Sequence, residues 1–82
     1  MFEEYFQKKE PLSDEQIAAL LSERQLRVIE SFANGDTVPG ISTEIGYAVD
    51  TIKDDCRRIY EVLEVNTQAG AVGKALRMGL VA

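Results

Sequence analysis

The chain has 82 residues, with 14 acidic and 9 basic side chains and a net charge of −5. This length allows one small domain, and 45% apolar with 28% charged residues is an ordinary composition for a globular protein. One cysteine and no histidine exclude an internal disulfide and a cysteine-based zinc site, and they leave no obvious group for acid–base catalysis.

Residues 1–20 are expected to form an N-terminal helical arm, separate from a domain over residues 21–82. Three aromatic residues at helical spacing precede the helix-breaking Pro11; they are Phe2, Tyr5 and Phe6. These side chains either fold back on the domain or contact a partner. After the proline, Ser13 and Gln16 have the spacing of a capping box, which predicts the start of a short helix.

A second capping box, formed by Ser22 and Gln25, predicts that a separate helix begins nine residues later. This helix carries an apolar stripe, and Asn34 with Gly35 is a typical helix end. Another short helix follows, with Thr37 as its N-terminal cap.

The most regular apolar stripe lies over residues 49–63, where intervals of three and four predict a helix of about four turns. The buried face comprises Val49, Ile52, Cys56, Ile59 and Leu63. We expect Cys56 to act as a small buried hydrophobic residue rather than a redox switch, and Tyr60 to pack at the edge of the core. The opposite face of this helix is charged.

The last helix is expected to begin at Thr67 and to have two apolar faces. We expect Val72, Leu76 and Leu80 to point inward. The second face is small and apolar, and we expect it to form a dimer interface through Ala71, Ala75 and Met78. A chain this short gains little stability from its own core, which also favours dimerisation.

The helix over 37–45, the turn 46–48 and the helix over 49–63 have the lengths of a helix-turn-helix, whose second helix lies in the major groove of DNA. The segment Thr51-Ile52-Lys53 opens the second helix. From Leu21 to Val81 the chain resembles the LuxR/GerE-type helix-turn-helix, a DNA-binding module of bacterial transcription regulators with a Thr-Val-Lys signature at this place. The resemblance implies an all-α fold, a small four-helix helix-turn-helix domain with an extra N-terminal helical segment.

The same resemblance implies that Lys53 and Arg57 contact bases or phosphates, and that the last helix forms a dimer contact. The candidate DNA-binding residues are Thr37, Thr51, Lys53, Asp54, Arg57 and Arg58. For Thr51, a phosphate contact and an ordinary place in the first helical turn remain open. Asp54 either accepts a hydrogen bond from cytosine N4 or pairs with Arg57 or Arg58, and the ion pair is favoured.

Several positions that are polar or basic in that family are neutral or acidic here. Thr43-Glu44 stands where a basic pair often ends the first helix of the motif, Ala48 replaces a capping serine, and Asp55 replaces a histidine. Residues 48–64 hold five acids and three bases. An aspartate that faces phosphates repels them, so these departures weaken the prediction of DNA binding.

Two functions are compatible with this pattern. The first is a small stand-alone transcription regulator that binds DNA, as a homodimer. The second is an interaction module of the same fold that has lost DNA binding and modulates another regulator or the transcription machinery. Neither function needs a cofactor, a metal or catalysis. No apolar run approaches the ~20 residues of a membrane helix, so no membrane contact and a cytoplasmic location are expected.

Overall fold

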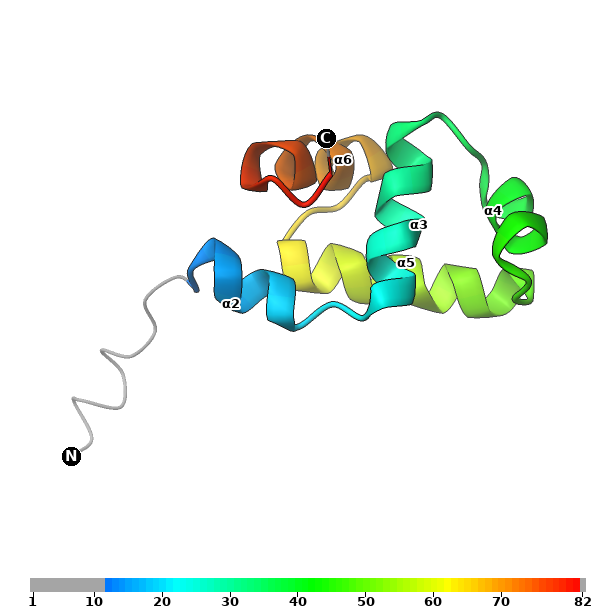
Figure 1. Ribbon diagram of the computed structural model, residues 1–82, viewed down its shortest axis with the longest axis horizontal. Coiled ribbons are helices and arrows are strands. Elements are labelled where there is room, and N and C mark those ends of the chain that lie inside the picture. The colour runs from blue at the N-terminus through cyan, green and yellow to red at the C-terminus, as the bar shows by residue number, and fades with distance from the viewer. Residues whose placement is uncertain (1–11, 82) are drawn as a thin grey trace.

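The computed structural model describes residues 12–81, and the regular structure in that range is entirely helical. The helices are α2 (Asp14–Ala19), α3 (Glu23–Ala33), α4 (Val38–Ile45), α5 (Val49–Leu63) and α6 (Gln68–Met78) (Figure 1). The predicted all-α class is therefore confirmed. The expectation for the aromatic residues Phe2, Tyr5 and Phe6 lies outside the described residues.

Helix α5 is the longest element and the base on which the others pack. Helices α3, α4 and α6 all contact it, and α3 also contacts α6. Figure 1 shows α4 at the N-terminal end of α5, α3 crossing its middle, and α6 beside its C-terminal half. Helix α2 extends the molecule at the end away from α4.

The starts of the helices follow the predicted caps. In both capping boxes the serine Oγ accepts a hydrogen bond from the glutamine N–H, and the glutamine side chain accepts one from the serine N–H. Thr37 and Thr67 cap α4 and α6 through their Oγ1 atoms, which accept from Gly40 and Gly70. Because each cap satisfies an N–H that the helix leaves unpaired, these side chains fix where the helices begin.

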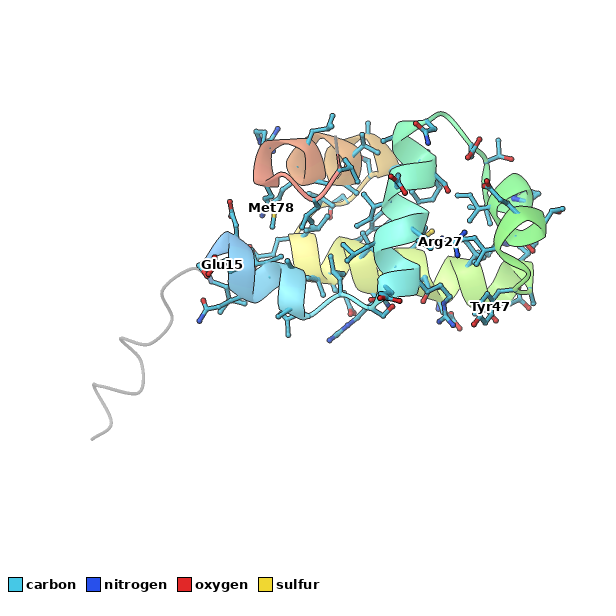
Figure 2. The ribbon with its side chains drawn as sticks, in the orientation of Figure 1. Glu15, Arg27, Tyr47 and Met78 are labelled. Carbon is cyan, nitrogen blue, oxygen red and sulfur yellow. The ribbon has the colours of Figure 1, made fainter. Side chains whose placement is uncertain are left out.

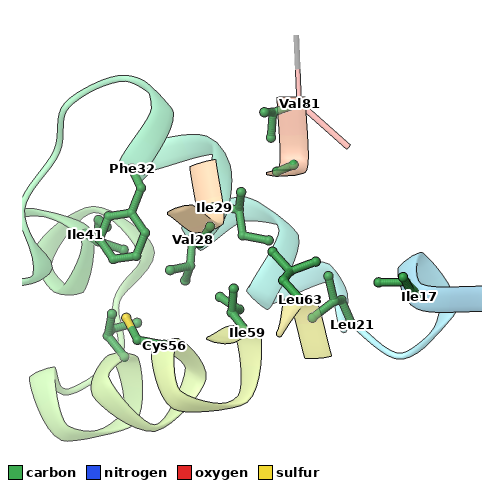
Figure 3. Packing of buried hydrophobic residues seen from close by; sticks show 13 residues of the cluster. Ile17, Leu21, Val28, Ile29, Phe32, Ile41, Cys56, Ile59, Leu63 and Val81 are labelled. Atoms are coloured by element: carbon green, nitrogen blue, oxygen red, sulfur yellow. The ribbon is translucent and has the colours of Figure 1, made fainter. Parts of the chain in front are cut away.

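The core runs along α5 and joins all five helices (Figure 3). Its six largest fully buried side chains are Val28, Ile29, Ile41, Ile52, Ile59 and Leu63. Ile17 and Leu21 are also buried and attach α2 and its connection to the same cluster. The expected burial of the stripe on α5 is confirmed, since Cys56 is buried as well.

The predicted orientation of α6 is correct only in part, because Val72 and Leu80 pack against the core as expected but Leu76 does not. Ala71 and Ala75 are fully buried in the core, whereas Leu76 is 47% exposed. Met78 is half-buried and packs against the core cluster. Small residues face α3 and α5 because they let the α6 backbone come close to both helices. Ala71 and Ala75 therefore do not form a surface that a partner can contact.

Candidate nucleic-acid interface

The turn between α4 and α5 is held by Ser42. The Ser42 carbonyl oxygen accepts hydrogen bonds from the N–H groups of Gly46, at 2.9 Å, and Tyr47, at 3.2 Å. The Ser42 hydroxyl in turn donates to the Tyr47 carbonyl. Gly46 has φ of 88°, a left-handed conformation that favours glycine, so the chain reverses within three residues. The helix-turn-helix predicted over 37–63 is therefore present.

The candidate threonines occupy two different places in this motif. Thr37 is exposed at the N-terminus of α4, where its side chain already serves as the cap. Thr51 is half-buried in the first turn of α5. Ala48 precedes α5 and offers no side-chain cap, as its replacement of a serine predicts. The first turn of α5 thus keeps backbone N–H groups free of side-chain capping.

The outer face of α5 carries the candidate basic residues. Lys53 and Arg57 are both exposed and lie four residues apart, about one helical turn. Among residues 12–81, no carboxylate pairs with Lys53 at ion-pair distance. These two side chains are therefore presented to solvent on one face of the second helix of the motif.

The arginines on this face are paired with acids of the same helix. The Arg57 guanidinium lies 3.1 Å from the Asp54 carboxylate, and that of Arg58 lies 3.8 Å from Glu61. The predicted pairing of Asp54 is confirmed, and its partner is Arg57. All four side chains are more than half exposed, so each pair contributes only a few tenths of a kcal/mol and can exchange for another partner.

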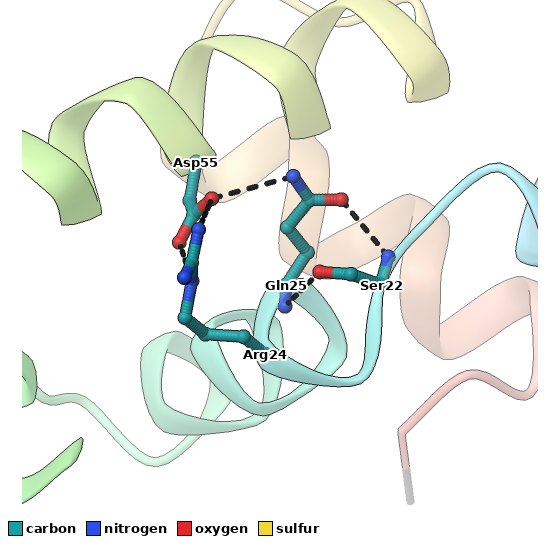
Figure 4. A network of polar contacts seen from close by, with 4 residues as sticks. All are labelled: Ser22, Arg24, Gln25 and Asp55. Carbon is teal, nitrogen blue, oxygen red and sulfur yellow. Dashed lines mark hydrogen bonds and ion pairs between the residues drawn. The ribbon is translucent and has the colours of Figure 1, made fainter. Parts of the chain in front are cut away.

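Asp55 does not lie on this outer face. Its side chain is only 4% exposed and points toward α3, where it accepts two hydrogen bonds from Arg24 (Figure 4). Arg24 Nε donates to Oδ2 at 2.7 Å, and Nη2 donates to Oδ1 at 3.0 Å. Gln25 Nε2 donates to Oδ1 at 3.3 Å. The expectation that Asp55 repels phosphates is therefore wrong, because its charge is buried and neutralised.

Arg24 is the residue that sequence reasoning missed. Besides the pair with Asp55, its guanidinium carbon lies 4.5 Å from the centre of the Tyr47 ring. Hydrogen bonding to Asp55 raises the pKa of Arg24 above its usual value, so it remains charged. Figure 2 shows Tyr47 at the α4–α5 end of the molecule. The signal in the sequence was the position of Asp55 at the edge of the apolar stripe, between Ile52 and Cys56.

The Cys56 thiol and the Tyr60 hydroxyl on α5 belong to the packing of the core. Burial raises the pKa of the Cys56 thiol and that of the Tyr60 hydroxyl, and both side chains belong to or pack against the core. A thiol with a raised pKa carries little thiolate at neutral pH. Cys56 and Tyr60 thus support the helix from within, as predicted.

The chain is similar to a known transcription regulator over most of its length. No protein-family profile and no solved structure matches the chain. The probable transcriptional regulatory protein NarL of Mycobacterium tuberculosis is 37% identical over 65 residues, in the strains CDC 1551/Oshkosh and ATCC 25618/H37Rv alike. The match covers 79% of this chain but only 30% of the relative's length.

The described residues give no sign of two other kinds of site. Within 12–81, no helix is both long and apolar enough to cross a membrane. The same residues contain no group of acidic or cysteine side chains placed to hold a metal ion.

Proposed function

We propose that this chain, whose helix-turn-helix is of the LuxR/GerE type, binds DNA with α5 in the major groove and acts in transcription regulation. The observation that carries the proposal is the pair Lys53 and Arg57, exposed one turn apart on the outer face of α5. Phosphates attract such side chains without regard to sequence, and an arginine in the major groove distinguishes guanine from other bases. The chain binds DNA without catalysing a reaction, and it does so in the cytoplasm.

The buried Asp55 strengthens this proposal. Residues 48–64 hold five acids, but Asp55 is neutralised by Arg24, so four acids and three bases remain on the surface of this segment. Asp54 is the acid in contact with Arg57, and their pair is exposed on both sides. A phosphate or a guanine edge can replace Asp54 as the partner of Arg57 at small cost.

A second function is favoured by the ion pairs themselves. If Arg57 and Arg58 keep their partners Asp54 and Glu61, α5 presents a face of alternating charge to another protein. The partner is then another regulator or the transcription machinery, and DNA affinity is absent even in low salt. The two functions therefore differ in one measurable property, the affinity for DNA in low salt.

We also propose that the chain forms a homodimer through α6, on a different face from the one expected. Leu76 is exposed on α6, Val72 one turn before it is half-buried, and Leu80 is half-buried just after the helix ends at Met78. These residues offer an apolar surface that a second copy covers. This chain spans less than a third of the length of the NarL relative that it matches.

The experiment that tests DNA binding is selection from a pool of random duplexes, followed by affinity measurements on the selected sequence. Arg57→Ala should weaken binding by about 1–3 kcal/mol and relax the preference at one base pair. Arg27→Ala removes the same charge from the exposed surface of α3 and should change affinity little. Recovery of no preferred sequence by the native chain, with no binding in low salt, would favour the interaction module.

A further inference from the structure

Asp55 is the buried charged residue of the described chain, and it sits in the middle of the helix proposed to read DNA. A buried carboxylate is costly unless it is paired and its oxygens are hydrogen-bonded. Both oxygens are satisfied here, by Arg24 from α3 and by Gln25 beside it. The pair therefore constrains how α5 can turn relative to α3, because rotation of α5 would break it.

The geometry of Arg24 adds a second constraint. Its guanidinium donates from two nitrogens to two oxygens of one carboxylate, and this fork is planar and directional. The same group lies against the ring of Tyr47, in the turn that joins α4 to α5. One side chain thus connects α3 with both the middle of α5 and the turn before it.

The base of this connection is itself fixed by the second capping box. Gln25 Oε1 accepts from Ser22 N–H at 3.0 Å, while Gln25 Nε2 donates to Asp55 (Figure 4). The Gln25 side chain, which is part of the capping box of α3, therefore also contacts α5. The network comprises Ser22, Arg24, Gln25, Asp55 and Tyr47, from three separate segments of the chain.

We propose that Arg24 is a positioning residue for DNA recognition, which sets the direction in which α5 presents Lys53 and Arg57. The inference rests on the proposed function. Successive residues of a helix are about 100° apart, so fixing Asp55 inward against α3 fixes the outward direction of its neighbours. The apolar stripe alone holds α5 less tightly, because hydrophobic burial has no preferred direction.

The test compares folded variants for their preference between the selected duplex and random DNA. Arg24→Met alone leaves Asp55 buried and unpaired, which destabilises the fold. The double variant Arg24→Met/Asp55→Leu removes both charges and should remain folded. We expect its preference for the selected duplex to fall at least about tenfold, with Arg24→Lys in between because lysine keeps the charge but loses the fork.

The control is Lys74→Met. Lys74 Nζ donates to the Leu63 carbonyl at 2.8 Å, so it also links another helix to α5, but at the end away from Tyr47. This variant should keep the native preference. A double variant that is folded and keeps the native preference overturns the proposal, because a purely structural role changes stability and not the preference of the folded protein.

A second readout separates this inference from the proposed function. Amide chemical shifts and interhelical contacts of the DNA-free protein are measured by NMR for the native chain and the double variant. We expect changes along the outer face of α5, including Lys53 and Arg57. Changes confined to the neighbours of the two substituted positions overturn the inference even if the native chain selects no DNA sequence.

Discussion

At the scale of single residues, the burial of the Asp55 carboxylate changes the interpretation of the charged face of α5. Asp54 and Asp55 are adjacent, and both look like charges that repel DNA. In the structure Asp54 is exposed beside Arg57, whereas Asp55 is buried against Arg24, 31 residues earlier. Asp55 lies between Ile52 and Cys56 of the buried stripe, a position that indicates the edge of the core, but a partner so far away in the chain leaves no local signal.

The buried stripe of α5 gives the first prediction. Ile52 is fully buried, so Ile52→Ala should lower the free energy of unfolding by about 2–5 kcal/mol, through lost apolar contact and the cavity left behind. Chemical denaturation followed by circular dichroism measures this change. A loss near zero would mean that the side chain is not packed as the structure shows.

Glu64 gives a second prediction at this scale. It ends α5 with φ of 57°, and within residues 12–81 no other non-glycine residue has a positive φ. Glycine adopts this conformation without strain, so Glu64→Gly should raise the free energy of unfolding by about 0.5–1 kcal/mol. Glu30→Gly inside α3 is the matched control and should lower it by about 1 kcal/mol. Equal changes in the free energy of unfolding for the two variants would contradict backbone strain at Glu64.

At the scale of helices, the elements were predictable because their ends carry local signals. The two serine capping boxes and the two threonine caps specify where α2, α3, α4 and α6 begin. The phase of α6 was not predictable, because Ala71, Val72, Ala75 and Leu76 are all apolar and form one continuous apolar side, of which either edge can pack inward. The face of α6 that packs inward depends on how closely its backbone approaches those of α3 and α5. The spacing of apolar residues in the sequence contains no information on that distance.

The outer face of α5 gives a prediction about charge. Asp54→Ala frees Arg57 and removes a charge that repels phosphates, so affinity for random DNA in low salt should rise several-fold. Glu15→Ala makes the same change in charge on α2, which Figure 2 places at the end of the molecule far from Tyr47. The control should leave affinity close to the native value. An equal rise in both variants would assign the effect to net charge alone.

At the scale of the whole molecule, the exposure of Leu76 and the burial of Ala75 on α6 change the test for a dimer. Leu76→Glu places a charge on the exposed apolar surface and should shift a concentration-dependent dimer to monomer with native helicity. Ala75→Glu, one residue earlier, places the same charge in the core and should unfold the domain. Sedimentation and circular dichroism together separate the two results. A native chain that is monomeric at high micromolar concentration would contradict the proposed dimer.

The whole molecule is acidic, yet the proposed interface depends on a few exposed bases of one helix. Distant charges are screened over about 8–10 Å in ordinary salt, so the local face of α5 decides the interaction with phosphates. The candidate residues Lys53, Arg57 and Arg58 could be predicted from the sequence. The pairing of Arg57 and Arg58 with neighbouring acids, and the burial of Asp55, depend on side-chain geometry.

The most direct test of the central claim is a salt titration of DNA binding by the native chain and by Lys53→Ala. If Lys53 contacts a phosphate, the plot of log affinity against log salt should be shallower for the variant by roughly one unit. Affinity should also fall for every sequence alike. If the native chain shows no affinity at low salt and Asp54→Ala does not restore it, α5 does not bind DNA and the interaction module replaces the proposal.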